Sequence, residues 1–187
     1  MNEELKKMKK RFILFTVVVS MLILAACQGK EGNTSEETLQ DIFDATKSEI
    51  VEALKADGVD EPLMDGKLSA YFETNLVDEE DEQSELYLEK LGIEKDQLAG
   101  GYVIAAMMNV NSNEIIILEA KDKSDVSSLE KALEKELAAQ TQTWEVYLPD
   151  QHEKVKNNII TTSGNYLMYI TYDEPEKLKA IFDEKTK

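Results

Sequence analysis

Residues 101–120 read GYVIAAMMNVNSNEIIILEA, and this stretch decides the class of fold. Two runs rich in apolar and β-branched side chains, Tyr102–Val110 and Glu114–Ala120, flank the polar tripeptide Asn111-Ser112-Asn113. Short polar loops of this composition connect neighbouring antiparallel strands. The stretch therefore predicts a β-hairpin.

A second hairpin is predicted nearer the C-terminus. Ile159–Ser163 and Tyr166–Tyr172 are separated by Gly164-Asn165, a two-residue turn in which glycine supplies the positive φ angle that such turns need. The two hairpins together predict four strands in a mainly antiparallel sheet.

Helical patterns surround both hairpins. Apolar side chains recur at helical spacing after Asp125, after Pro149 and after Pro175, and an N-terminal helix over Leu39–Leu54 is expected to end near Gly58. Helices that follow hairpins in this order predict an α+β fold.

We therefore expect a single two-layer α+β domain over residues 38–187, with helices packed on one face of a four-stranded sheet. Residues 86–183 define this domain best, because both hairpins and the helices between and after them lie there. Its order of strands does not follow from the sequence.

Residues 59–85 have the least regular pattern. Leu68, Tyr71 and Phe72 fit either a helical turn or a short strand, and the role of the region is left open. A helix is expected to resume at Leu86–Leu91 and to stop at Gly92, since glycine is common just after a helix.

The first 27 residues have the parts of an export signal: a basic start, an apolar run and small residues before a cleavage point. Phe12–Ala26 offers 15 residues, whereas a spanning helix needs about 20 apolar ones. Leu24-Ala25-Ala26-Cys27 resembles a bacterial lipobox, with cleavage between Ala26 and Cys27. Residues 1–26 are therefore predicted to be a lipoprotein signal peptide, and Cys27 to carry the lipid.

The lipid on Cys27 is expected to hold the chain at the extracytoplasmic face of the cell membrane, with residues 27–37 as a flexible tether. Residues 1–26 carry five basic and two acidic side chains, so the remainder carries 16 and 36, a net charge of −20. This charge argues against nucleic acid as a partner and against a broad electrostatic contact with anionic lipid, because both are polyanions.

Cysteine and histidine are too scarce for several kinds of site. Cys27 is the only cysteine, which excludes a disulfide, a Cys-based metal site and a thiol nucleophile in the domain. His152 is the only histidine, which excludes a multi-histidine zinc site and leaves a single candidate for a general base. No cofactor motif is present, and no cofactor is expected.

An acidic run offers one candidate for a cation site. The candidate ligands are Asp78, Glu80, Asp81 and Glu82, but the spacing of an EF-hand is absent. The alternative is a solvated acidic loop, which is the usual state of a block of like charges.

Four residues are candidates for a binding site. Trp144 and Tyr147 could form an aromatic platform for a peptide or sugar, or could close the junction between two helices. His152 could act as a base or lie on the surface, but no nucleophile elbow accompanies it. Asn109, in the asparagine-rich first hairpin, could bind a ligand or form a turn.

Several short motifs resemble the family of domains of unknown function numbered 4358, found in lipoproteins of Gram-positive bacteria. The likeness covers about Tyr87–Phe182. It implies a lipoprotein location and a fold, but no activity and no functional residues. The motifs that carry it are Met108-Asn109-Val110, Asn113-Glu114-Ile115, Ala120-Lys121-Asp122, Trp144, Tyr147-Leu148-Pro149-Asp150-Gln151, Val155 and Gly164-Asn165-Tyr166.

These observations favour a non-catalytic interaction or ligand-binding module anchored in the membrane, with an envelope protein or a small ligand as its partner. A protein that responds to divalent cations through residues 78–85 is one alternative. An extracytoplasmic hydrolase that uses paired carboxylates is another, although 36 acidic residues offer too many pairs to single one out.

Overall fold

The computed structural model describes the backbone of residues 35–187 and the side chains from residue 38 onward. The predicted signal peptide, the lipidation site Cys27 and the tether up to residue 34 lie outside the described residues. Helix α2 begins at Ser35, three residues before the expected start of the domain.

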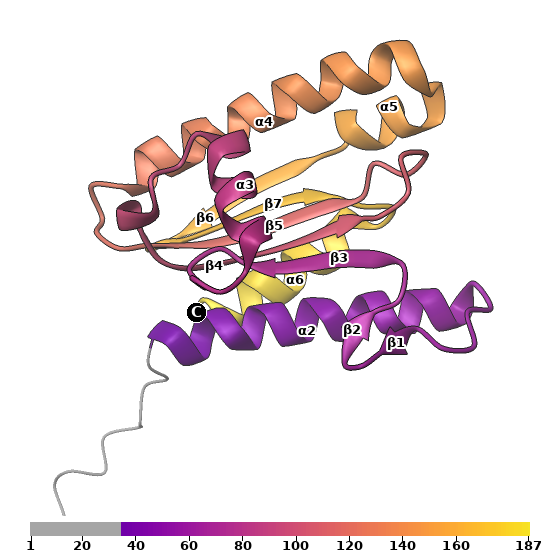
Figure 1. Ribbon diagram of the computed structural model, residues 1–187, viewed down its shortest axis with the longest axis horizontal. Coiled ribbons are helices and arrows are strands. Elements are labelled where there is room, and N and C mark those ends of the chain that lie inside the picture. Colours follow the sequence, from indigo (N-terminus) through magenta and orange to yellow (C-terminus); the bar gives the residue numbers. More distant parts are fainter. Residues whose placement is uncertain (1–34) are drawn as a thin grey trace, which may run out of the picture. The chain divides into compact units, whose positions relative to one another are not determined.

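A five-stranded antiparallel sheet forms the centre of the domain (Figure 1). Its strand order is β3-β4-β5-β7-β6, so the two predicted hairpins, β4–β5 and β6–β7, are joined through β5 and β7. The strands are β3 (Tyr71–Asn75), β4 (Leu98–Ala106), β5 (Glu114–Ala120), β6 (Ile159–Ser163) and β7 (Tyr166–Thr171).

The prediction of four strands is wrong by one. β3 pairs with β4 along one edge, in the region that the sequence left open between a helical turn and a strand. A separate two-stranded hairpin, β1 (Leu63–Met64) and β2 (Lys67–Leu68), precedes it.

Strand β4 begins and ends four residues earlier than predicted, since it spans Leu98–Ala106 and the sequence predicted Tyr102–Val110. It ends at Ala106, and the backbone N–H of Met107 still bonds to the carbonyl of Ala70 in the register of β3 and β4. The backbone N–H of Asn111 then bonds to the carbonyl of Met108 and forms a turn. Residues 107–113 therefore form a loop, and the methionines expected in a strand lie in that loop.

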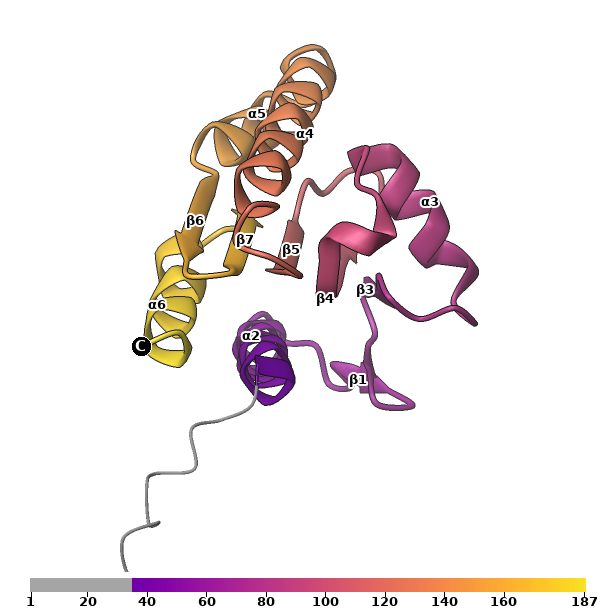
Figure 2. The same ribbon diagram turned by 90° about the vertical axis from the view of Figure 1, so that its left-hand side faces the viewer.

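Helices cover both faces of the sheet, so the expectation of two layers with helices on one face is also wrong (Figures 1 and 2). The cause is β5, whose seven residues are all buried. A strand buried on both faces reads as a continuous apolar run. The helices are α2 (Ser35–Ala56), α3 (Glu82–Leu91), α4 (Val126–Tyr147), α5 (Pro149–Lys156) and α6 (Pro175–Lys185).

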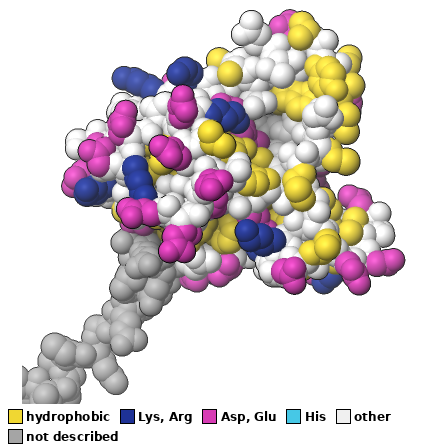
Figure 3. All heavy atoms as spheres, viewed as in Figure 1, with side chains coloured by type: hydrophobic (Ala, Val, Ile, Leu, Met, Phe, Trp, Pro, Cys, Tyr) yellow, Lys and Arg dark blue, Asp and Glu magenta, His cyan; other side chains and the backbone are white. Residues whose placement is uncertain are grey.

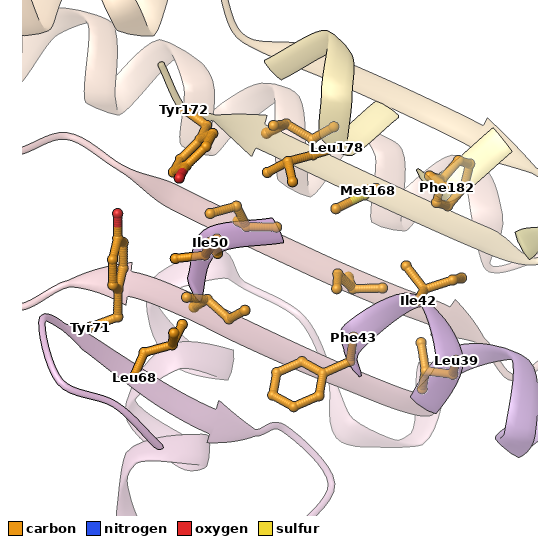
Figure 4. Close-up of a cluster of buried hydrophobic side chains, with 14 residues drawn as sticks. Leu39, Ile42, Phe43, Ile50, Leu68, Tyr71, Met168, Tyr172, Leu178 and Phe182 are labelled. Carbon is orange, nitrogen blue, oxygen red and sulfur yellow. The ribbon is translucent and has the colours of Figure 1, made fainter. Parts of the chain in front are cut away.

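Each face of the sheet has its own apolar core. On one face α2 and α6 pack on the sheet through side chains such as Ile42, Ile50 and Phe182 (Figure 4). On the other, α3 and α4 pack on it through side chains such as Leu88 and Leu133. Alternate side chains of β5 enter the two cores.

Among the described helices, none is both long enough and apolar enough to cross a membrane.

Candidate interaction surface

The loop between β4 and β5 is held firmly against α5. The backbone N–H and the hydroxyl of Ser112 both donate hydrogen bonds to Oε1 of Gln151, at 2.9 and 3.0 Å. Lys154 Nζ donates to Oδ1 of Asn113 at 2.8 Å, and Nδ2 of Asn113 donates to the hydroxyl of Tyr71 at 2.8 Å. Residues from α5 and β3 therefore fix the base of this loop.

An ion pair joins α5 to the segment just before α6. Lys154 Nζ also lies 2.9 Å from a carboxylate oxygen of Asp173, and only 12% of its side chain is exposed. Asn111 Oδ1 accepts the backbone N–H of Asn113 at 3.0 Å, which closes the turn. Asn111 thus forms the turn, and the side-chain oxygens of Asn111 and Asn113 accept hydrogen bonds from Lys154.

Above this fixed base the loop presents apolar side chains to solvent. Met107 is 61% exposed, Met108 63% and Val110 48%. Val146, at the C-terminal end of α4, is 87% exposed, and Met64 of the β1–β2 hairpin is 62% exposed. Figure 3 shows apolar side chains gathered at the end of the domain where these elements lie. We call these five residues the apolar end.

Exposed apolar side chains that gather in one place mark protein or membrane interaction sites or ligand-binding grooves. Methionine suits such a surface, because its unbranched, polarisable side chain adapts to the shape of a partner. A loop that is already fixed loses less conformational entropy on binding. The apolar end therefore has the properties of a docking surface.

The predicted binding residues fall partly on this surface. Asn109 is exposed in the loop, and Tyr147 is half-exposed at the end of α4. Trp144 is buried, and its indole N–H donates to Oε1 of Gln140 at 2.8 Å. His152 is partly buried on α5. Trp144 and Tyr147 lie with ring centres 5.8 Å apart, where α4 turns into α5.

The acidic candidates do not gather around a common point. Asp81 caps α3, with one oxygen accepting the backbone N–H of Gln83 at 3.0 Å, and Asp78 accepts the backbone N–H of Glu80 at 2.9 Å. Glu82 is exposed in the first turn of α3. Across residues 35–187, no group of three Asp, Glu, His or Cys side chains is arranged to hold a metal ion.

Sequence reasoning missed an ionic cluster that joins three elements through two buried glutamates and a lysine whose side chain is 39% exposed. Lys90 Nζ of α3 lies 2.7 Å from Oε1 of Glu114, the first residue of β5, and 3.0 Å from Oε1 of Glu136 on α4. Glu114 is 5% exposed and Glu136 is 4% exposed. Charged residues this far apart in the sequence carry no local pattern, so only the fold brings them together.

The electrostatics of this cluster are set by burial. Burial raises the pKa of Glu114 to about 7, with the nearby Lys90 opposing the rise and Glu136 adding to it. The second carboxyl oxygen of Glu114 has no hydrogen-bond partner among the described residues. Burial lowers the pKa of Lys90, but the two carboxylates outweigh this effect and raise the pKa above its usual range.

The model of the family described as "Domain of unknown function (DUF4358)" matches residues 73–172, more than half of the chain. The chain belongs to the DUF4358 family. The expected resemblance is therefore confirmed. No curated protein and no solved structure matches this DUF4358 protein.

The DUF4358 match spans the central sheet from β3 to the end of β7, together with α3, α4 and α5. It includes the loop of residues 107–113, the ionic cluster and the contacts between Ser112 and Gln151. Helices α2 and α6, which cover one face, lie outside the matched residues. Four of the five residues of the apolar end, all but Met64, fall within them.

Proposed function

We propose that this DUF4358 protein is a non-catalytic interaction module. In this proposal residues 1–26 direct export, a lipid on Cys27 anchors the chain at the extracytoplasmic face of the cell membrane, and the domain binds an envelope protein. The observation that carries the proposal is the apolar end, with exposed side chains from a loop, a helix and a hairpin.

The position of the apolar end suits a protein anchored through its N-terminus. Helix α2 begins at the end of the described domain opposite the loop of residues 107–113 (Figure 1). A chain attached before Ser35 can therefore present that loop away from its point of attachment. The loop's fixed base supports rapid docking without prior rearrangement.

The best-placed carboxylates support a structural role better than hydrolysis. Glu114 and Glu136 are buried and share one lysine, whereas a hydrolase needs its paired carboxyl groups open to substrate and water. For the same reason we do not propose the carboxylate hydrolase as a second function.

The first test is cross-linking in native membranes followed by pull-down. We compare the wild type with the triple variant Met108→Ser, Val110→Ser and Val146→Ser, and use Leu86→Ser, an exposed apolar position on α3, as the matched control. We expect one envelope protein to be recovered with the wild type and the control. Recovery should fall about tenfold or more with the triple variant, as hot-spot residues dominate affinity.

Unchanged melting temperatures show that the triple variant still folds. Equal recovery by the triple variant contradicts the role of the apolar end. The anchor is tested separately by mass spectrometry: the wild-type chain should begin at Cys27 and carry the mass of a diacylglyceryl group, which the Cys27→Ala variant should lack. A wild-type chain without this mass contradicts the lipid anchor.

A further inference from the structure

Strand β3 leaves one side of the sheet open. It pairs with β4 on one side, and none of the described strands pairs along the other. The backbone groups of Ala70 and Leu76 bond to β4. Because antiparallel pairing alternates along a strand, the N–H and C=O groups of Tyr71 and Glu73 point away from β4.

A groove runs along this open edge. It has a volume of about 720 Å³ and lies between the β1–β2 hairpin and the segment that leads into α3. Figure 2 shows β3 at the side of the sheet, with α3 above it and β1 below. Tyr71, Phe72 and Glu73 of β3 line the groove, so the open backbone edge faces into it.

The groove has an apolar part that meets the apolar end. Met64 and Met107 both line the groove and both belong to the apolar end. Phe72 adds an aromatic ring, which is held in place by stacking on Tyr87 of α3 with ring centres 5.6 Å apart. An occupant of the groove therefore contacts apolar side chains at several points along its length.

The opposite wall of the groove is acidic. Asp78, Glu80, Asp81 and Glu82 line it, against a single lysine, Lys67. Glu80 and Glu82 are exposed, whereas the carboxylate of Asp81 is engaged by the backbone of Gln83. Basic side chains complement such a wall, and acidic ones are repelled by it.

We propose that an extended segment of a partner protein, with alternating apolar and basic side chains, adds to the sheet as a sixth strand along β3. This inference rests on the proposed function, since it names how the partner is held and what chemistry it carries. Strand addition supplies main-chain hydrogen bonds for affinity, and the side-chain surroundings supply specificity. Successive side chains of a strand point to opposite faces of the sheet, so the segment contacts the groove with a period of two residues.

The charge of the protein argues against a second copy as the occupant. Residues 27–187 carry a net charge of −20, so two copies repel each other, and the groove adds its own acidic wall. A natural edge strand that is not protected usually invites pairing with another chain. Here the acidic wall restricts that pairing to basic segments.

The test uses full-length protein in detergent and a labelled peptide of alternating lysine and valine. Binding is measured by fluorescence anisotropy, and backbone amide exchange is resolved to single residues. We expect the amides of Tyr71 and Glu73 to become protected. The amides of Ile160 and Thr162, which point outward from the other edge strand β6, serve as the internal control and should not change.

Two control peptides separate strand addition from simple attraction. One has glutamate in place of lysine, and the other has methylated backbone nitrogens that cannot donate hydrogen bonds. Each should bind about tenfold or more weakly than the lysine peptide, because one loses the charge and the other the main-chain bonds. Equal binding by the methylated peptide overturns strand addition.

Charge reversal locates the binding site. Glu80→Lys together with Glu82→Lys should weaken binding of the lysine peptide about tenfold. The control is Glu130→Lys with Glu134→Lys, two exposed positions on α4 that give the same change in net charge. Equal loss in both double variants, or protection of β6 in place of β3, overturns the proposal.

These outcomes are separable from those of the proposed function. Met108, Val110 and Val146 do not line the groove, so the triple variant tests the apolar end alone. If that variant abolishes capture but the lysine peptide leaves β3 unprotected, the interaction module stands and strand addition is wrong.

Discussion

At the scale of single residues, the ionic cluster of Lys90, Glu114 and Glu136 places two carboxyl groups around one ammonium group. Two negative charges cannot both be balanced there by one positive charge at low dielectric. Burial and the nearby Glu136 favour the protonated form of Glu114, whereas Lys90 favours the charged form. The stability of the domain should therefore depend on pH through this cluster.

The resulting prediction concerns stability against pH. An exposed glutamate titrates near 4.5, whereas burial raises the pKa of Glu114 to about 7. Between these values the folded state binds more protons than the unfolded state, so the free energy of unfolding falls as pH rises. From this group we expect a loss on the order of 2–3 kcal/mol between pH 4.5 and 7.

Glu114→Gln removes the titrating group and keeps an oxygen for Lys90, and its amide can donate to Glu136. Urea unfolding should therefore show the variant more stable than the wild type at pH 8, with the difference vanishing near pH 5. Glu130→Gln, exposed on α4, is the matched control and should show no such trend. A Glu114→Gln chain that is weakened equally at both pH values contradicts the protonated state.

Some residues of the candidate site could be predicted from the sequence, and others could not. Tyr147 and Asn109 were candidates and lie at the exposed end. The continuous apolar run of the sequence predicts a strand that includes Met107 and Met108. The structure shows that the strand has ended there, because the backbone N–H of Asn111 bonds to the carbonyl of Met108 in a turn.

At the scale of elements, the acidic run forms the loop that leads into a helix, and only its last residue, Glu82, belongs to that helix. Helix α3 begins at Glu82, four residues before the expected start at Leu86. Asp81 caps it, and the other oxygen of Asp81 accepts the hydroxyl of Thr74 at 2.6 Å. The helix ends at Gly92 with a φ of 68°, as predicted from glycine at that position.

The cap supports a prediction for α3. Asp81→Ala removes the acceptor for the backbone N–H of Gln83 and leaves the hydroxyl of Thr74 without its partner. We expect a loss of about 1–2 kcal/mol in urea unfolding, the usual cost of a lost N-cap. Asp81→Asn keeps an acceptor for the helix and should lose less.

The control for the loss of a negative charge near the helix start is Glu82→Ala, at an exposed position one residue later. This variant should lose less than about 1 kcal/mol of the free energy of unfolding. If Asp81→Ala proves no more costly than Glu82→Ala, the capping role is wrong.

The two hairpins and the five described helices could be predicted from the sequence because their signals are local, although α3 begins earlier than expected. A two-residue Gly-Asn turn and apolar residues at helical spacing need no knowledge of distant segments. Strand β3 could not be predicted from the sequence in this way. Its five residues, Tyr71–Asn75, are fixed by pairing with β4, with Tyr71 opposite Ala106 and Asn75 opposite Tyr102. Short strands take their register from a partner, and that information is not local.

At the scale of the whole domain, one sheet holds two cores together. Helices α2 and α6 pack on one face of the sheet, and α3 and α4 pack on the other. The backbone of β5 belongs to both cores, as its Ile115 and Ile117 enter one and its Ile116 and Leu118 the other. Loss of packing on either face should therefore weaken the same sheet.

This arrangement predicts a single cooperative unfolding transition. Ile42→Ala empties part of the core under α2, and Leu133→Ala part of the core under α4; both side chains are fully buried. Each should cost about 2–5 kcal/mol, the range for a large-to-small change in a core. Trp144 lies on α4, so its fluorescence reports on that helix alone, whereas far-ultraviolet circular dichroism reports on all helices.

The Ile42→Ala variant is the decisive case, because the substitution and the fluorescent reporter lie on opposite faces of the sheet. If the sheet couples the two cores, fluorescence and circular dichroism shift together to lower urea, with the slope of the transition unchanged. If α2 unfolds by itself, circular dichroism changes first and the Trp144 transition stays where the wild type has it. That separation would show that the β3-to-β7 region matched by the family holds its fold without the face that α2 covers.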